Sequence, residues 1–236
     1  MSDAPLTAAE LAELAKIDTP TICNALEIVA PERRADGFTY KPLVCPFPSL
    51  PPIVGYARTA TIRASHRSPF SKAEDRALRL QYYRQFERKP GPTISVIQDL
   101  DGPLVGFGAF WGEVQTTIHK GLGCLGVVTD GCVRDIEMMA KGFQVLAGSI
   151  APSHGWVHLV DVGRTVNIHG MMVSDNDLIH ADHHGAVVIP HAVARKVAAA
   201  AELCGRREAP ILAAARKPGF TVADLERAMG EADEIH

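Results

Sequence analysis

The sequence has no long apolar stretch and no basic leader segment. No window approaches the roughly 18 apolar residues that a membrane-spanning helix requires. The opening segment, MSDAPLTAAELAELAKIDTP, carries acidic side chains and lacks the basic region followed by an apolar region that marks a secretory signal. From these absences we expect a cytoplasmic protein that does not bind membranes.

Cysteine is scarce and scattered. The five cysteines form no CxxC pair and are odd in number, which argues against a disulfide framework and against a thiolate zinc site. Cys124 and Cys132 lie among small apolar residues. We expect both to be buried, unreactive thiols.

A basic excess is also missing. Lysine and arginine number 24 against 27 aspartates and glutamates, for a net charge of −3. Nucleic-acid binding usually shows itself as a surplus of positive charge, so we expect no nucleic-acid partner. What is present is a chain of 236 residues, 47% hydrophobic, which is enough for one sizeable core. Without repeats, linkers or low-complexity segments, the chain is predicted to form a single domain over residues 1–236.

The hydrophobic pattern predicts an α/β fold. Near the N-terminus, Thr7 with Glu10 forms a capping-box pattern, and Asp18 precedes a second helix. Strands and helices then alternate up to residue 150, and short strands with turn signals follow. The expected strands are 55–64, 93–100, 124–130, 143–150, 157–162, 165–173 and 177–190, and the expected helices include 111–119, 134–142 and 191–216, the last broken or bent near Gly205 and Pro210.

Two segments stand apart from this alternation. Residues 41–52 contain five prolines and are not expected to form a regular element. Residues 65–92 form an insertion in which 72–88 is rich in charge, with apolar side chains at partly helical spacing. We interpret 72–88 as a surface helix with one apolar face; pairing with another subunit is the alternative.

A candidate site lies between Gly106 and Pro190. One strand ends at Asp130 and is predicted to turn into a helix that opens with Arg134 and Asp135. Ligands collect at the carboxyl ends of strands in open α/β sheets, and helix starts attract anions. A second glycine-rich turn presents Glu113. The alternative is structural: an aspartate that stabilises a helix start, in a salt bridge with its neighbouring arginine. Spacing alone does not separate these interpretations.

The run GxxGVVTDGxVRDxxxxxxxGFxVLA, preceded by WGE and followed by DLIHADxxGAVVIP, resembles the RraA-like family. That family includes the regulator of ribonuclease activity A and the class II 4-hydroxy-4-methyl-2-oxoglutarate/4-carboxy-4-hydroxy-2-oxoadipate aldolases. The resemblance covers residues 17–30, 53–63 and 93–216. It implies a β/β/α swivelling-type domain that assembles as a homotrimer or homohexamer with sites between subunits.

In the aldolase members, the resemblance implies that Asp135 binds Mg²⁺ or Mn²⁺ directly and that Arg134 contacts the pyruvyl group. An acidic residue 22 positions upstream reaches the metal through water, which identifies Glu113 in this sequence. The aldolases carry aspartate there, so the side chain is one methylene longer here.

Further site residues follow from the same resemblance. Backbone amides just after the upstream acid hold the substrate carboxylate, which indicates Val114 and Gln115, with Gly112 beside them. A glutamate from the C-terminal helix of a neighbouring subunit completes the metal site, and Glu208 is the candidate because GRREAP resembles that helix. Pro210 close by departs from the family pattern.

The implied activity is that of a divalent-metal-dependent lyase on a small 2-oxo acid. Retro-aldol cleavage would release pyruvate through a metal-stabilised enolate, and decarboxylation of oxaloacetate would use the same enolate. The alternative is a non-catalytic regulator that binds a ribonuclease or another protein. A regulator would not need Glu113 and Asp135 together, so this pair favours the lyase.

The ten histidines suggest two further sites. Strand alternation would place His180, Asp182 and His184 on one face, where they could bind zinc; the alternative is a polar edge before a hairpin turn. His154 and His158 follow the strand 143–150, and either could reach the cleft as a general acid or base.

Overall fold

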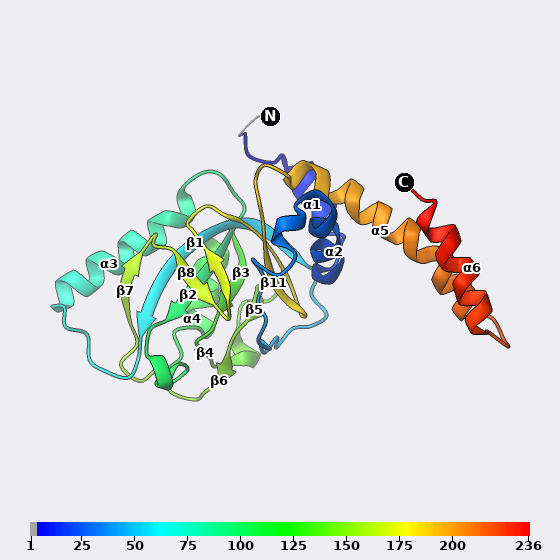
Figure 1. The fold of residues 1–236 in the computed structure, drawn as a ribbon. Helices are drawn as coiled ribbons and strands as arrows, with labels where there is room; N and C mark the ends of the chain where they lie inside the picture. Colours follow the sequence, from blue (N-terminus) through cyan, green and yellow to red (C-terminus); the bar gives the residue numbers. More distant parts are fainter. Residues whose placement is uncertain (1–3) are drawn as a thin grey trace.

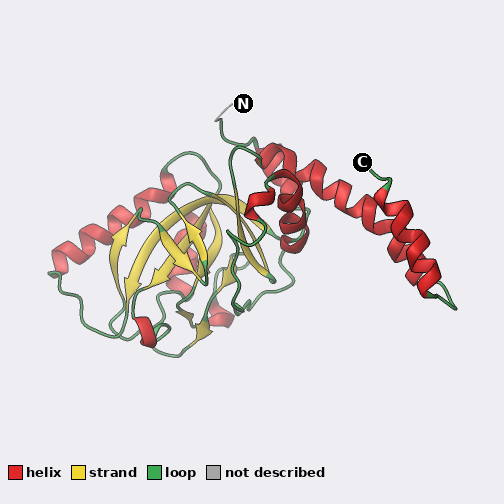
Figure 2. Ribbon diagram, in the orientation of Figure 1, coloured by secondary structure: helices red, strands yellow, loops and turns green. Residues whose placement is uncertain are grey.

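The structure is a computed structural model, and it describes residues 4–236. A curled sheet of seven strands forms the body (Figures 1 and 2). The long strand β1 (Ile53–Arg63) lies at its centre and pairs in parallel with β2 (Thr93–Asp99). Outward from β2 the sheet continues, still in parallel, with β3 (Cys124–Thr129) and β5 (Gln144–Leu146).

The other edge of β1 is shared by two antiparallel partners, which gives the sheet its curl. The first residues of β1 pair with β10 (Leu178–Asp182), which continues through a tight turn into β11 (Gly185–Ile189). The last residues of β1 pair with β7 (His158–Val162), across a register shift. Two small sheets flank the body: β4 (Cys132–Val133) with β6 (Ser149–Ile150), and β8 (Val166–Ile168) with β9 (Met171–Val173).

The described residues form six α-helices. Their bounds are α1 (Ala8–Leu14), α2 (Thr19–Val29), α3 (Lys72–Arg84), α4 (Glu113–Gly121), α5 (Ala194–Ala215) and α6 (Val222–Asp233). Short 3-10 helices occupy Pro31–Arg33, Gln85–Glu87, Gly102–Leu104 and Ile136–Met138. The described residues include no helix that is both long enough and apolar enough to cross a membrane.

The core has three parts. One lies between α1, α2, α5 and the β10–β11 edge, a second lies under α3 and α4, and a third lies beneath the β8–β9 hairpin. Cys124 and Cys132 are buried free thiols, as predicted. Burial raises the pKa of both thiols, to about 12 and about 11, so neither is ionised near neutral pH.

The N-terminal predictions are confirmed. Thr7 and Glu10 form a reciprocal capping box, and Asp18 accepts a hydrogen bond from the Thr21 amide at 2.9 Å. The proline-rich segment 41–52 contains no helix or strand, only an isolated bridge between Val44 and Ala147.

The insertion is confirmed as a helix with one apolar face. Tyr82 of α3 and Phe86 of the following 3-10 helix are buried in the core, while most other side chains of α3 are exposed. Arg58 of β1, itself buried, holds the returning chain because its guanidinium donates to the backbone oxygens of Gln85, Arg88 and Pro90 at 2.7–3.0 Å. The insertion is therefore an integral part of the body.

The predicted helix 134–142 does not form. After Asp130 the chain continues as β4, Asp135 takes a left-handed conformation with φ 55°, and one 3-10 turn, Ile136–Met138, takes the place of the predicted helix. The reason is long-range pairing, since the Arg134 amide donates to the Trp111 oxygen at 3.0 Å and keeps the chain extended. The predicted strand 143–150 is likewise divided into β5 and β6, around Gly148.

The C-terminal helix is not broken at Gly205 or Pro210. The helix α5 runs from Ala194 to Ala215 with Pro210 inside it. A proline removes one amide donor, and the carbonyl left without a partner is that of Arg206. Because Arg206 is exposed, water can bond to that carbonyl. With α6 packed along it, α5 extends away from the sheet as a helical hairpin (Figure 1).

Candidate functional site

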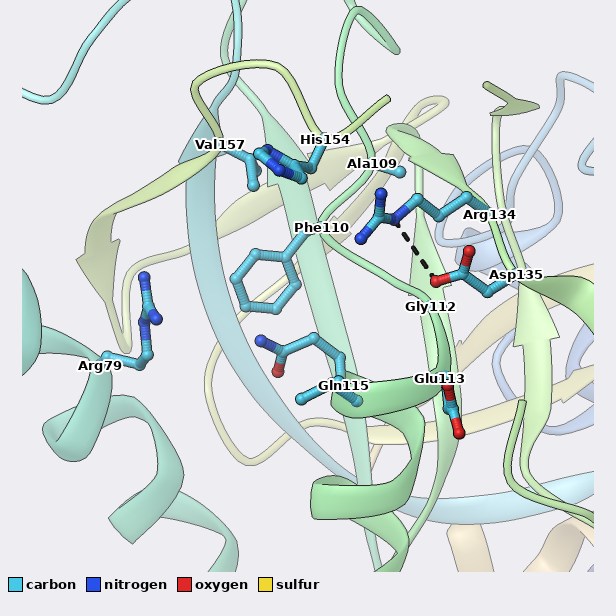
Figure 3. A pocket seen from close by; sticks show the side chains of 11 residues that line it. Arg79, Ala109, Phe110, Gly112, Glu113, Gln115, Arg134, Asp135, His154 and Val157 are labelled. Atoms are coloured by element: carbon cyan, nitrogen blue, oxygen red, sulfur yellow. Dashed lines mark ion pairs between the residues drawn. The ribbon is translucent and has the colours of Figure 1, made fainter. Parts of the chain in front are cut away.

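A cavity of about 280 Å³ opens where the start of α4 meets the end of β4 (Figure 3). Backbone and side chains from four segments surround it. They are Arg79, Ala109, Phe110, Gly112, Glu113, Val114, Gln115, Arg134, Asp135, His154 and Val157. Six of these were predicted site residues: Arg134, Asp135, Glu113, Val114, Gln115 and Gly112. The structure therefore brings most of the predicted set to one cavity.

The start of α4 supplies backbone donors to this cavity. Gly112 is the residue that caps the helix, and it has no side chain with which to bond the first amides. The first amides of any α-helix have no partner within the helix, and the helix dipole places positive charge there. The amides of Glu113, Val114 and Gln115 thus form a small site suited to an anion.

Arg134 and Asp135 face this helix start. The Arg134 Nε lies 3.4 Å from Asp135 Oδ2, and both side chains are about two-thirds covered. Figure 3 shows the guanidinium and the carboxylate side by side above Gly112. The alternative reading of the sequence expected a salt bridge between Arg134 and Asp135 at the start of their own helix. The salt bridge is present, but it lines a cavity and lies at the start of α4 instead.

Gly112 lies in close contact with this pair. A Cβ atom at this position would lie 2.6 Å from Asp135 Oδ2 and 3.3 Å from Arg134 Cγ. Real Cβ atoms do not approach oxygen so closely, so any side chain here would displace the carboxylate. The glycine lets the backbone of the helix start lie directly against the arginine–aspartate pair.

Glu113 and Glu208 are placed differently from Asp135. Glu113 is exposed, and its carboxylate points away from Asp135 in Figure 3. Glu208 is exposed on α5 and does not line the cavity of its own chain. Its contribution to the site of a neighbouring subunit stays a prediction.

One wall of the cavity includes a residue outside the predicted set. Arg79 reaches toward the cavity from α3, opposite Arg134 (Figure 3). The helical spacing of Leu78 and Tyr82 marks the packed face of α3, and Arg79 lies at the border of that face. The spacing of apolar residues in the sequence therefore indicated which side of α3 is packed, but not which element of the protein that side packs against.

Of the two histidines proposed as acid or base, one lines the cavity. His154 Nδ1 lies 2.8 Å from the oxygen of Gly155. A carbonyl can only accept, so Nδ1 carries the proton and Nε2 is the basic nitrogen of the neutral ring. His158 is buried, bonds the Trp156 oxygen at 2.9 Å and does not line the cavity.

A buried network behind the cavity fixes α4. His119 Nδ1 donates to the Gln115 oxygen at 2.7 Å, and its Nε2 lies 2.9 Å from Tyr82 Oη. Tyr82 Oη also bonds Ser95 Oγ at 2.7 Å. Burial lowers the pKa of His119 to about 4, so the ring is neutral. On the cavity side, Tyr83 Oη donates to Gln115 Oε1 at 3.0 Å.

Two carboxyl groups lie at the adjoining ends of β2 and β3. Asp99 Oδ2 accepts the Gly106 amide at 2.9 Å, and Asp130 Oδ1 accepts the Asp99 amide at 2.7 Å. Burial, together with the charge of Asp99, raises the pKa of Asp130 to about 7; burial also raises the pKa of Asp99. This pair holds the loops that lead toward the cavity.

The predicted zinc trio does not form. His180 is fully buried: Nδ1 bonds the Thr19 hydroxyl at 3.0 Å, and Nε2 lies 2.9 Å from the Ile17 oxygen. Both nitrogens are therefore engaged in structural bonds. Asp182 and His184 remain near each other at the β10–β11 turn.

Comparison with known proteins identifies the family. A model described as RraA-like, Aldolase/RraA, matches residues 19–188, most of the chain. The chain belongs to the RraA-like family. This family includes aldolases and regulators of ribonucleases, and the match contains every predicted site residue except Glu208.

Solved structures agree with the RraA-like fold. An uncharacterized protein from Pseudomonas syringae superposes with a TM-score of 0.73 at 21% identity, over 98% of this chain and 97% of that one. RraAS2 from Streptomyces coelicolor, an unusual member of the RNase ES inhibitor RraA family, gives 0.68 at 18% identity, over 87% and 96%. At these identities the likeness shows the fold alone.

One relative by sequence is an uncharacterized protein from Methanocaldococcus jannaschii. It is 40% identical over 83 residues, which are 34% of this chain and 40% of that protein. The match spans less than half of either length, so it adds no activity to the family assignment.

Proposed function

We propose that this RraA-like protein is a divalent-metal-dependent lyase that cleaves or decarboxylates a small 2-oxo acid. The observation that supports the proposal is the cavity in which the Arg134–Asp135 pair lies against the start of α4, where no side chain bonds the first amides. Such a cavity offers positive charge, backbone donors and a carboxylate within one small volume. These are the groups needed to hold an anionic 2-oxo acid and to stabilise the charge that develops on its keto oxygen.

The substrate carboxylate binds at the helix start. The amides of Val114 and Gln115 and the dipole of α4 attract it, and the close packing of Gly112 leaves room for it beside the arginine. The Arg134 guanidinium presents a planar set of donors to the carboxylate and the keto oxygen. Together these groups orient the scissile bond.

The donor set fits Mg²⁺ or Mn²⁺. Asp135 and Glu113 offer carboxylate oxygens, which hard divalent cations prefer, and such cations keep several waters. Asp135 would hold the ion directly and the longer, exposed Glu113 would reach it through water, with Glu208 of a neighbouring subunit as a further ligand. When bound, the ion supplies Lewis-acid stabilisation of the negative charge on the substrate oxygen.

His154 is the candidate for proton transfer at the cavity wall. Its Nδ1 is held by the Gly155 oxygen, which leaves Nε2 as the proton acceptor or, when protonated, the donor. The loop that carries it is fixed because the Ala109 amide donates to the Ser153 oxygen at 2.9 Å. Gly108 packs so closely on the His154 backbone that a Cβ there would lie within 2.4 Å of it.

The test is pyruvate release coupled to lactate dehydrogenase. Oxaloacetate and 4-hydroxy-4-methyl-2-oxoglutarate serve as substrates, with Mg²⁺ or with EDTA. We expect metal-dependent pyruvate release that falls by about 100-fold or more in Arg134→Ala, since one lost donor to a developing oxyanion costs that much. Arg76→Ala is the matched control, because Arg76 is exposed on α3 and does not line the cavity.

Two outcomes contradict the proposal. Absence of metal-dependent pyruvate from both substrates rejects the lyase and leaves a non-catalytic regulator, which titration against a ribonuclease would examine. Full activity in a folded Arg134→Ala variant places the chemistry elsewhere.

RraA-like proteins are typically oligomeric, and we propose a homotrimer or homohexamer here, to be measured by light scattering.

A further inference from the structure

The β10–β11 turn carries a second group of potential ligands, on a different part of the sheet from the lyase cavity. Asp182 ends β10, His183 and His184 form the turn, and Gly185 begins β11. One ligand atom from each of Asp182, His183 and His184 lies within 4.8 Å of the other two. We call these three residues the hairpin site.

We propose that the hairpin site binds a divalent late transition metal ion, of which Zn²⁺ is the test case. Two imidazoles and one carboxylate are ligands that zinc, copper and nickel accept, whereas Mg²⁺ takes oxygen ligands. Donors around a tetrahedral Zn²⁺ lie roughly 3.4 Å apart, given bonds of about 2.1 Å. The two exposed rings can close the remaining distance by small side-chain rotations.

The carboxylate of the hairpin site is fixed before any ion arrives. Asp182 is 2% exposed; its Oδ2 accepts the Thr19 amide at 2.9 Å and its Oδ1 accepts the His184 amide at 2.8 Å. Burial raises the pKa of the Asp182 carboxyl, but these hydrogen bonds outweigh burial and hold that pKa below its ordinary value. The carboxylate is therefore ionised near neutral pH and keeps lone pairs for a third partner.

The two rings are already gathered on one side of the turn. The ring centres of His183 and His184 are 3.9 Å apart, and His184 Nδ1 lies 3.1 Å from Asp182 Oδ1. The turn itself is anchored, because the Ala186 amide donates to the Thr39 hydroxyl at 3.1 Å. Little ordering of the backbone is then needed on binding, which favours affinity.

This inference does not depend on the lyase proposal. The hairpin site shares no residue with the cavity around Arg134 and Asp135. His180, two residues before Asp182 on β10, takes no part, because both of its nitrogens bond to the α1–α2 region.

The experiment is calorimetric titration of the tag-free, full-length protein with ZnCl₂. Wild type and Asp135→Asn are expected to bind Zn²⁺ at the hairpin site with the same affinity, since Asp135 belongs to the other cavity. His183→Ala and His184→Ala should each weaken this binding at least tenfold. Both histidines are exposed, so the variants should fold, and thermal unfolding without metal verifies this. His66→Ala is the matched control, because His66 is exposed and remote in sequence from the hairpin.

The competing results are distinct. No saturable Zn²⁺ binding by the wild type at millimolar concentration overturns the proposal. Unchanged affinity in either histidine variant overturns the three-ligand site, and loss of all binding in Asp135→Asn assigns the ion to the lyase cavity instead. At equal concentration, added Zn²⁺ should also raise the melting temperature of the wild type more than that of the histidine variants, because weaker binding stabilises the folded state less.

Discussion

Replacement of Asp130 by asparagine should stabilise the protein at alkaline pH. Burial, with the nearby charge of Asp99, raises the pKa of the Asp130 carboxyl from 3.8 to about 7. Between these values the folded state holds a proton that the unfolded state has lost, so stability falls as pH rises. At 1.36 kcal/mol for each pKa unit, the difference corresponds to about 4 kcal/mol once the group is fully ionised.

The Asp130→Asn variant removes this ionisation and keeps an oxygen that can accept the Asp99 amide. From the same linkage, its advantage over wild type should be about 2 kcal/mol near pH 5 and about 4 kcal/mol near pH 8. Urea unfolding at both pH values measures it. Asp233→Asn, exposed on α6, should show no such trend. An Asp130→Asn protein that is no more stable than wild type near pH 8 would refute the reasoning.

Two further variants examine the support of the cavity. Gly112→Ala places a methyl group against Asp135 and should lower the proposed lyase activity at least tenfold without unfolding the protein, whereas Gly121→Ala, in open space at the other end of α4, should not. Equal activity in both would show that the close packing is unimportant. Tyr82→Phe leaves two buried partners without a hydrogen bond and should cost about 1–3 kcal/mol in urea unfolding. Tyr83→Phe, which loses one partly exposed bond, should cost less; the reverse order would contradict the network.

Local signals in the sequence were sufficient for much of the fold. The capping pattern at Thr7 and the aspartate at Asp18 begin helices because their side chains bond amides only three residues away. The strands 93–99 and 124–129 are short segments rich in β-branched residues between turn residues, and such segments favour strands. These features depend mainly on residues that are close together in the sequence.

The segment after Asp130 was predicted wrongly because its conformation is set by distant partners. Residues 134–142 include good helix formers, yet Cys132 pairs with Ser149 and the Arg134 amide bonds Trp111. Asp135 then takes the left-handed conformation, which aspartate tolerates better than most residues. The predicted residues Arg134 and Asp135 do line one cavity, but the helix start beside them belongs to α4.

The residue that the insertion contributes to the cavity wall could not be read from the sequence, because it depends on how the insertion packs. Tyr82 is fixed by His119 of α4, and Arg79 lies three positions earlier on α3, on a neighbouring part of the same face. The Tyr82–His119 contact, which fixes α4, therefore also fixes the backbone position of Arg79 on α3. Substitution of Arg79 would alter this wall while leaving Tyr82 and the α4 amides in place. On the proposed function, such a change would alter which substrate is accepted beyond its pyruvyl group and would leave the chemistry at that group intact.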